Sequence, residues 1–84
     1  MYWVYILRSF KDGNLYIGQT SNLNRRLQYH NSGRVRSTKK RAPFELIYIE
    51  EFLSRGEAMK REKVLKSMKS KDFKKMLRNL PFVG

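Results

Sequence analysis

Residues 2–7, Tyr-Trp-Val-Tyr-Ile-Leu, form an unbroken run of apolar and aromatic side chains near the start of the chain. The run is rich in residues that favour strands, and its lack of polar positions is typical of a strand that is covered on both faces. We therefore expect residues 2–7 to be the central strand of a sheet, and the rest of the fold must supply a cover for each of its faces.

The next strand-like segment, residues 15–18, follows a turn signal at Asp12-Gly13. This arrangement predicts an antiparallel hairpin, which places Tyr5 and Tyr16 on neighbouring strands. A helix of about ten residues is expected to follow, because an apolar stripe at helical spacing lies between capping signals. Its candidate N-caps are Thr20, Ser21 and Asn22, its stripe is Leu23, Leu27 and His30, and its stop is Gly33.

The remaining chain predicts a loop, a third strand and two further helices. Residues 34–43 lack a hydrophobic period and end in proline, so we expect an exposed basic loop. Residues 44–52 are β-branched and aromatic, which predicts a strand. A capping box at residues 54–57 opens a helix whose apolar face is Ala58, Leu65 and Met68. Ser70 is expected to cap a last helix with the stripe Phe73, Met76, Leu77 and Leu80, ended by Pro81.

These elements predict an α+β fold with a small three-stranded antiparallel sheet flanked by helices, in the order β-β-α-β-α-α. At 84 residues the chain is expected to form a single domain, residues 1–84. Cysteine is absent, which excludes a disulfide framework, a thiolate metal site and a cysteine nucleophile. The sequence has neither a charged leader nor an apolar run near the ~20 residues that span a bilayer, so we expect a cytoplasmic protein without a membrane partner.

Charge gives the first indication of a partner. Nineteen Lys and Arg against seven Asp and Glu give a net charge of +12, with ten of the cations in residues 55–78 and five in residues 34–41. Clustered positive charge favours binding to a nucleic acid, while a basic surface without a specific partner remains the alternative. A ribonuclease with paired histidines is disfavoured by the single histidine, and a P-loop enzyme by the scattered glycines.

Certain polar residues lie where burial is expected. Glu62 falls on the apolar face of its predicted helix, where a carboxylate needs a partner or a metal; an ion pair with Lys66 is the structural alternative. Arg26 borders the stripe of the first predicted helix, and His30 follows it by one turn. Solvent contact for Arg26 and a satisfied buried imidazole for His30 are the alternatives there. Tyr5 and Tyr16 could equally be core residues with hydroxyls at the rim.

The spacing of these residues resembles the GIY-YIG nucleases over most of the chain, from Trp3 to about Arg78. Trp3-Val4-Tyr5 looks like the GIY segment with tryptophan in place of glycine, and Tyr16-Ile17-Gly18 matches the YIG segment. Residues 26–30 resemble the arginine and histidine of the family's first helix, and residues 62–66 resemble its glutamate followed by an apolar-Lys pair. The likeness is strongest to small single-domain bacterial members, similar to the nuclease portion of an excinuclease subunit.

The resemblance implies an endonuclease that hydrolyses DNA with one divalent ion, Mg²⁺ or Mn²⁺. Glu62 would hold the metal, Tyr5 or Tyr16 would take the proton of the attacking water, Arg26 would clamp the phosphate, and His30 would relay a proton or hold the phosphate. Residues 14–43 contain no carboxylate, which independently disfavours a two-metal site. The cations expected to hold the nucleic-acid backbone are Arg34, Arg36, Lys39, Lys40, Arg41 and Lys66.

Two readings of function remain open from the sequence. The first is a DNA endonuclease, with structure-selective cleavage in repair or recombination as the narrower expectation. The second is a catalytically weak module that keeps the fold and binds nucleic acid. Phosphate contacts carry no sequence information, so we expect little sequence preference from this domain alone. Nuclease relatives usually take their specificity from an added domain or a partner, so the resemblance implies a protein partner. The chain is expected to be a monomer or a weak dimer.

Overall fold

The computed structural model describes residues 1–78 and contains a three-stranded antiparallel sheet. Its strands are β1 (Tyr2–Ser9), β2 (Leu15–Thr20) and β3 (Phe44–Phe52), in the order β2-β1-β3. The hairpin of β1 and β2 pairs Tyr5 with Gly18, and β1 pairs with β3 on its other side. The predicted α+β class, the hairpin and the central position of the first strand are therefore confirmed.

The alternating side chains of β1 enter two different hydrophobic cores. Val4 and Ile6 point to one face of the sheet, and Tyr5 and Leu7 point to the other; all four are almost fully buried. This explains why the run has no polar position: a central strand between two helical layers has no side in contact with water. The strand thus carries Tyr5 into the interior rather than onto the surface.

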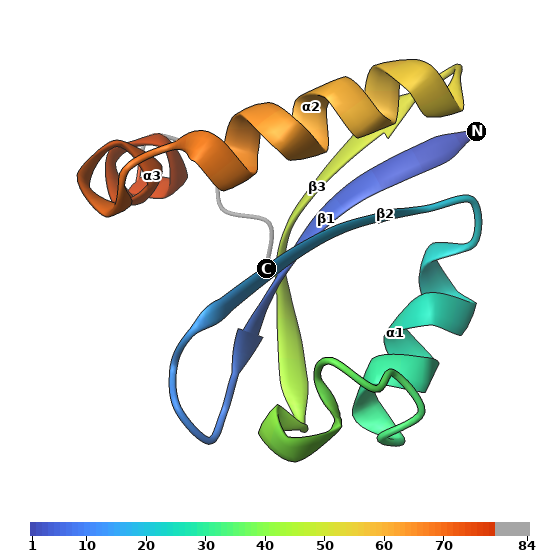
Figure 1. Cartoon of the computed structure of the whole chain (residues 1–84), viewed down its shortest axis with the longest axis vertical. Helices are drawn as coiled ribbons and strands as arrows, with labels where there is room; N and C mark the ends of the chain where they lie inside the picture. Colours follow the sequence, from blue (N-terminus) through green and yellow to red (C-terminus); the bar gives the residue numbers. More distant parts are fainter. Residues whose placement is uncertain (79–84) are drawn as a thin grey trace.

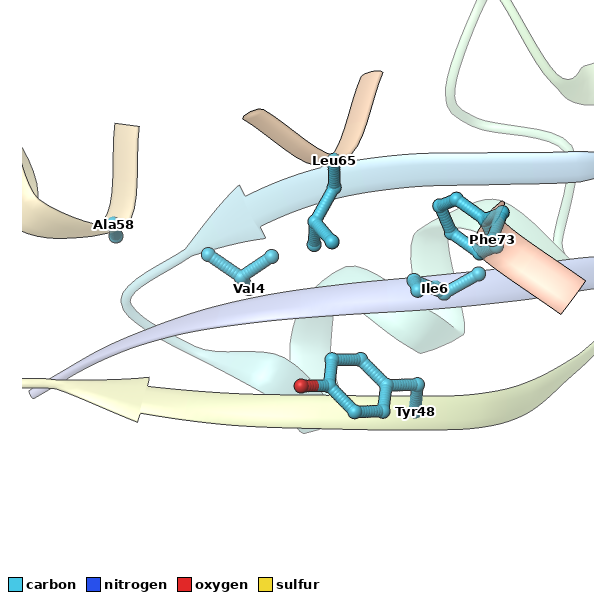
Figure 2. Close-up of a cluster of buried hydrophobic side chains, with 6 residues drawn as sticks. All are labelled: Val4, Ile6, Tyr48, Ala58, Leu65 and Phe73. Atoms are coloured by element: carbon cyan, nitrogen blue, oxygen red, sulfur yellow. The ribbon is translucent and has the colours of Figure 1, made fainter. Parts of the chain in front are cut away.

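The two faces of the sheet are covered by different helices (Figure 1). Helix α1 (Leu23–Asn31) packs on the side of Tyr5, while α2 (Arg55–Ser67) and α3 (Ser70–Arg78) pack on the opposite side. Figure 2 shows the core beneath α2 and α3, which is formed by Val4, Ile6, Tyr48, Ala58, Leu65 and Phe73. Within the described part of the chain, no helix combines the length and the apolar character needed to cross a bilayer.

Local capping accounts for the helix boundaries. Of the three candidate N-caps of α1, Asn22 has the role, since its side chain accepts a hydrogen bond from the Arg25 N–H at 3.1 Å. Gly33 has a φ of 77°, a left-handed conformation that glycine adopts without strain just after a helix end. Ser54 caps α2 in the same way, accepting from the Glu57 N–H.

The segment between α1 and β3 differs from the predicted exposed loop. Val35 and Thr38 are buried, and a short 3₁₀ helix, η1 (Lys39–Arg41), follows them. The prediction was wrong because two isolated buried residues create no periodicity, and the flanking cations dominate the pattern. The charged side chains still face outward at Arg34, Arg36, Lys39 and Lys40. In the last predicted helix, Leu80 and Pro81 lie outside the described residues.

Candidate active site

The two tyrosines of the hairpin lie together on the face of the sheet that α1 covers. Tyr5 comes from β1 and Tyr16 from β2, and their ring centroids are 6.3 Å apart. Tyr5 is 1% exposed, whereas Tyr16 is half-buried. The sequence prediction that the hairpin brings the two side chains onto neighbouring strands holds, but only Tyr16 is open to a ligand in this conformation.

Gly18 makes room for the Tyr5 ring, which lies across the neighbouring strand. A Cβ atom added at position 18 would lie 2.5 Å from the Tyr5 hydroxyl oxygen, 2.7 Å from Tyr5 Cζ and 3.1 Å from Tyr16 Cε1. These separations are too short for any side chain at this position. The glycine is therefore required by the packing of the tyrosine on β1, not by a special backbone angle.

His30, in the last turn of α1, is fully buried and has a protein partner on each ring nitrogen. Nε2 lies 2.9 Å from the Tyr5 hydroxyl, and Nδ1 lies 2.8 Å from the Thr38 hydroxyl. Its ring also packs against Tyr16 at 4.8 Å between centroids and edge-on against Phe44 at 5.9 Å. The alternative of a satisfied buried histidine therefore describes its contacts well, and His30 is separated from solvent by its neighbours.

Burial shifts the pKa values of this buried pair in opposite directions. Desolvation, together with the nearby charge of Arg26, lowers the pKa of His30 to about 4. Desolvation also raises the pKa of Tyr5 to about 12, although Arg26 opposes the rise and Tyr16 and Glu62 add to it. Both groups are neutral near pH 7. Arg26 lowers the pKa of the Tyr5 phenol, but burial outweighs this effect.

Arg26 extends from α1 toward both tyrosine hydroxyls. Interaction with Tyr5, and secondarily with Tyr16, raises the pKa of its guanidinium, while its Nε is buried without a partner among the described residues. Arg26 lines a hollow of about 220 Å³ together with Arg25 and Tyr29. It also lines a hollow of about 390 Å³ together with Tyr2 and Arg55. The guanidinium thus lies between a buried hydroxyl and open, positively charged depressions.

Glu62, on α2, is half-buried and forms the ion pair with Lys66 that the sequence offered as an alternative. Lys66 Nζ lies 3.5 Å from Glu62 Oε1, and the Lys66 side chain is 56% exposed. The charge of the Glu62 carboxylate is the smallest of the influences on the pKa of Tyr5, and α2 packs on the face of the sheet opposite to Tyr5. Elements β1, β2 and α1 therefore bring Tyr5, Tyr16 and Arg26 together, and the influence of Glu62 from α2 is weaker.

The donors in this region fit a hard divalent ion bound through few protein ligands. In residues 1–78 no group of three or more His, Cys, Asp or Glu side chains could enclose a metal. The oxygen donors among the candidate site residues are the carboxylate of Glu62 and the hydroxyls of Tyr5 and Tyr16. Mg²⁺ prefers oxygen ligands and keeps several waters, so a single carboxylate combined with substrate oxygens suits it.

Burial divides these residues into an accessible trio and a buried connection. The accessible trio is Tyr16, Arg26 and Glu62, all half-buried. The buried connection is made by the side chains of Tyr5, His30 and Thr38, each no more than 1% exposed. Of these six residues, only the trio can touch a large substrate in this conformation.

The cations that the sequence assigned to the nucleic-acid backbone fall into two groups. Arg34, Arg36, Lys39 and Lys40 are exposed, and Arg34 also lies 5.5 Å from the centroid of the Tyr29 ring. Arg41 instead pairs with Asp12 at 3.3 Å between Nε and Oδ2, and Lys66 pairs with Glu62. The last two cations are thus engaged within the protein.

Sequence reasoning missed three residues that adjoin this region. Thr38 falls in the segment predicted to be an exposed loop, although it lies eight residues after His30 and contacts it. Arg25 and Arg55 stand out in the sequence only as members of charged segments, yet each shares a hollow with Arg26. The position of Arg25 could have indicated its place beside Arg26. It directly precedes Arg26 in the first turn of α1, and that turn has no acidic residue to pair with either arginine.

Replacing Gly18 with Ala is expected to lower the free energy of unfolding by about 1–3 kcal/mol, because the new methyl group must displace the Tyr5 ring. Gly56→Ala is the matched control. That glycine lies in the first turn of α2, and a Cβ atom added there would have nothing within 4 Å, so the change should be neutral or stabilise slightly. Urea denaturation measures both; equal effects would contradict the steric account of Gly18.

The depressed pKa of His30 predicts a pH-dependent loss of stability. Between its ordinary pKa of 6.5 and about 4, the unfolded chain binds a proton at this residue that the folded chain does not. The free energy of unfolding should therefore fall as the pH decreases through this window. Urea denaturation of wild type and His30→Gln at several pH values tests this: their difference should shrink toward pH 4, and parallel curves would contradict it.

Comparison with known proteins places this arrangement in a family. The family model of the GIY-YIG catalytic domain matches residues 1–76. A UPF0213 protein of Oceanobacillus iheyensis is 43% identical over 68 residues, which cover 80% of this chain and 78% of the relative. One from Staphylococcus haemolyticus is 40% identical over 77 residues, covering 90% and 93%.

A solved structure agrees with these matches. The solution NMR structure of a UPF0213 protein from Bacillus halodurans has 35% sequence identity and a TM-score of 0.61, covering 93% of this chain and 84% of its own. The shared fold therefore extends over nearly the whole described chain. The chain belongs to the GIY-YIG family, whose catalytic domain implies nuclease-type activity, and is similar within it to the UPF0213 proteins.

Proposed function

We propose that this protein is a metal-dependent endonuclease that hydrolyses phosphodiester bonds in DNA. The observation that carries the proposal is the grouping of Tyr16 and Arg26 with Tyr5: the two tyrosine rings are 6.3 Å apart, Arg26 interacts with both phenols, and Glu62 adds a weaker charge effect on Tyr5. Arg26 comes from α1, Tyr16 from β2 and Glu62 from α2, which are three separate elements of the fold. A cation, a carboxylate and hydroxyls gathered in one basic region are suited to a phosphate and the metal that accompanies it.

Arg26 is proposed to bind the scissile phosphate. Its guanidinium faces hollows that contain further arginines, and its Nε has no partner within the described chain, so it retains donors for an anion. The planar donors of a guanidinium suit the oxygens of a phosphodiester. Their hydrogen bonds become stronger as negative charge develops on those oxygens in the transition state. The contact with Tyr5 would keep the side chain directed toward this place.

Glu62 is proposed to hold one Mg²⁺ or Mn²⁺ ion, with waters and substrate oxygens as its other ligands. Bound there, the ion would supply positive charge for the phosphate oxygens and the leaving group. Lys66 must then release the carboxylate, which is feasible because the Lys66 side chain is 56% exposed and its pair with Glu62 is weak in water. A free Lys66 can instead contact the backbone of the substrate.

Tyr16 is proposed to face the attacking water, while Tyr5 positions Arg26. Tyr16 is half-buried and reachable, whereas Tyr5 is 1% exposed, contacts His30 and has a pKa raised to about 12. In this step Tyr16 would act as the phenolate, its own proton having passed to solvent beforehand. A water O–H bond breaks as the water oxygen bonds to phosphorus, the proton passes to the phenolate oxygen, the bond from phosphorus to the leaving oxygen breaks, and that oxygen takes a proton from solvent. His30 then acts on the reaction through Tyr5 rather than by touching the substrate.

The exposed cations are proposed to hold the DNA backbone on either side of the site. Arg25 and Arg55 share hollows with Arg26, and Arg34, Arg36, Lys39 and Lys40 lie exposed on the segment after α1. Such contacts give affinity that depends on salt and little preference for sequence. Selectivity for branched or damaged DNA in repair or recombination would then arise from the shape of the substrate or from a protein partner.

A nucleic-acid-binding module with weak or no catalysis is the second candidate. It is favoured by the Glu62–Lys66 ion pair, which occupies the one carboxylate that the first proposal assigns to the metal. Such a module would bind DNA in a salt-sensitive manner without responding to Mg²⁺. The two candidates differ in what happens when the carboxylate is removed.

Glu62→Gln is expected to reduce cleavage of labelled branched and nicked DNA in Mg²⁺ by about 100-fold or more, because the metal loses its protein ligand. The control is Glu57→Gln, which changes an exposed acid of the same helix and should leave cleavage unchanged. Binding is measured without metal to establish that both variants still bind. If the proteins bind the DNA but none of them cuts it, the result supports the binding module instead of the endonuclease.

The two tyrosines are expected to respond differently to loss of their hydroxyls. Tyr16→Phe should lower kcat by about 100-fold, since it removes the proposed proton acceptor. Tyr5→Phe should lower it by about tenfold, since Arg26 loses a positioning contact. Single-turnover cleavage with Mg²⁺ measures both changes. A larger loss for Tyr5→Phe would assign the proton transfer to Tyr5 instead.

A further inference from the structure

We propose that Thr38 is a positioning residue that determines which nitrogen of His30 carries the proton and, through His30, the direction of the Tyr5 hydroxyl relative to Arg26. The catalytic consequence rests on the proposed function, but the proton arrangement itself does not. Thr38, His30 and Tyr5 form a continuous buried connection of hydrogen bonds that leads from the segment after α1 to Arg26, a member of the accessible trio.

The end of the connection at Thr38 fixes the direction of the first hydrogen bond. Thr38 is 0% exposed, and its Oγ1 lies 2.8 Å from His30 Nδ1 and 3.4 Å from the Val35 carbonyl oxygen. A hydroxyl has one hydrogen, and a carbonyl oxygen can only accept. When Thr38 donates to Val35, its oxygen accepts from His30, which places the imidazole hydrogen on Nδ1.

The arrangement at Thr38 sets the direction of the next hydrogen bond. With the ring hydrogen on Nδ1, Nε2 can only accept, so the Tyr5 hydroxyl, 2.9 Å away, must donate to it. The lone pairs of the Tyr5 oxygen are then left for a donor. Arg26 interacts with Tyr5 and fits this arrangement, because a guanidinium has donors and no acceptor.

The environment of His30 leaves room for a single ring proton. The imidazole is completely buried, and its pKa is lowered to about 4 by burial and by the charge of Arg26. The neutral ring is therefore one of two tautomers, and the contacts at its two nitrogens select between them. In the opposite tautomer, Nε2–H would donate to the Tyr5 oxygen and compete with Arg26 for its lone pairs.

Nitrogen NMR on ¹⁵N-histidine-labelled full chain tests the inference directly. His30 is the single histidine of the sequence, so every histidine nitrogen signal belongs to it. Near pH 7 the wild type should show a protonated Nδ1 and an unprotonated Nε2. Thr38→Ser keeps the hydroxyl and should give the same signals, whereas Thr38→Val should show a shift of the proton to Nε2 or a mixture of tautomers.

Ser37→Ala controls for disturbance of the segment, because it removes an exposed hydroxyl next to Thr38. A wild type with its proton on Nε2 would overturn the inference, and so would a Thr38→Val protein with unchanged signals. Thermal unfolding identifies a variant that fails to fold. If Thr38→Val does not fold, Thr38→Ala with the same readout replaces it, and the wild-type tautomer decides the inference by itself.

Cleavage assays separate this inference from the proposed function. If the protein cuts DNA, Thr38→Val should lower kcat by about tenfold while leaving DNA binding unchanged, and Thr38→Ser should restore it. If the protein cuts none of the substrates, the proposed nuclease function fails, whereas the histidine signals still confirm or overturn the role of Thr38. An active enzyme whose tautomer does not respond to Thr38→Val would overturn the inference alone.

Discussion

The hydrogen bond between Tyr5 and His30 joins the two halves of the candidate site. It links the central strand to α1 across a core in which neither polar group meets water, and each group would be costly to bury without the other. Thr38 satisfies the second nitrogen of the imidazole and thereby ties the following segment to the same core. The position of α1, and with it the direction of Arg26, depends on this buried connection.

Much of the fold could be predicted from local patterns, because the responsible interactions are local. The apolar run at residues 2–7 indicated a central strand, and Asp12-Gly13 indicated the hairpin. Asn22 and Ser54 cap their helices as their positions suggested. The tyrosines, Arg26 and Glu62 were recognised through motif spacing, which reports positions along the chain and says nothing about which side chains are accessible.

The arrangement within the site could not be predicted, because it depends on contacts between distant segments. The rise in the pKa of Tyr5 comes mainly from burial, which no tripeptide motif reveals. The buried position of Thr38 depends on how residues 32–43 fold back onto α1, and a lone threonine among cations carries no hydrophobic signal. Gly18 was identified as part of a motif, but its steric reason is the ring of a residue on another strand.

Depressions adjoin Arg26 on the side of Arg25 and Tyr29 and also on the side of Tyr2 and Arg55. The two depressions share Thr20, Ser21 and Arg26 in their linings, so they adjoin one another at this arginine. An anion that enters either depression meets two arginines, and Arg26 is one of them in both cases. A single side chain of α1 thus serves both hollows, which makes its orientation matter for the whole of this surface.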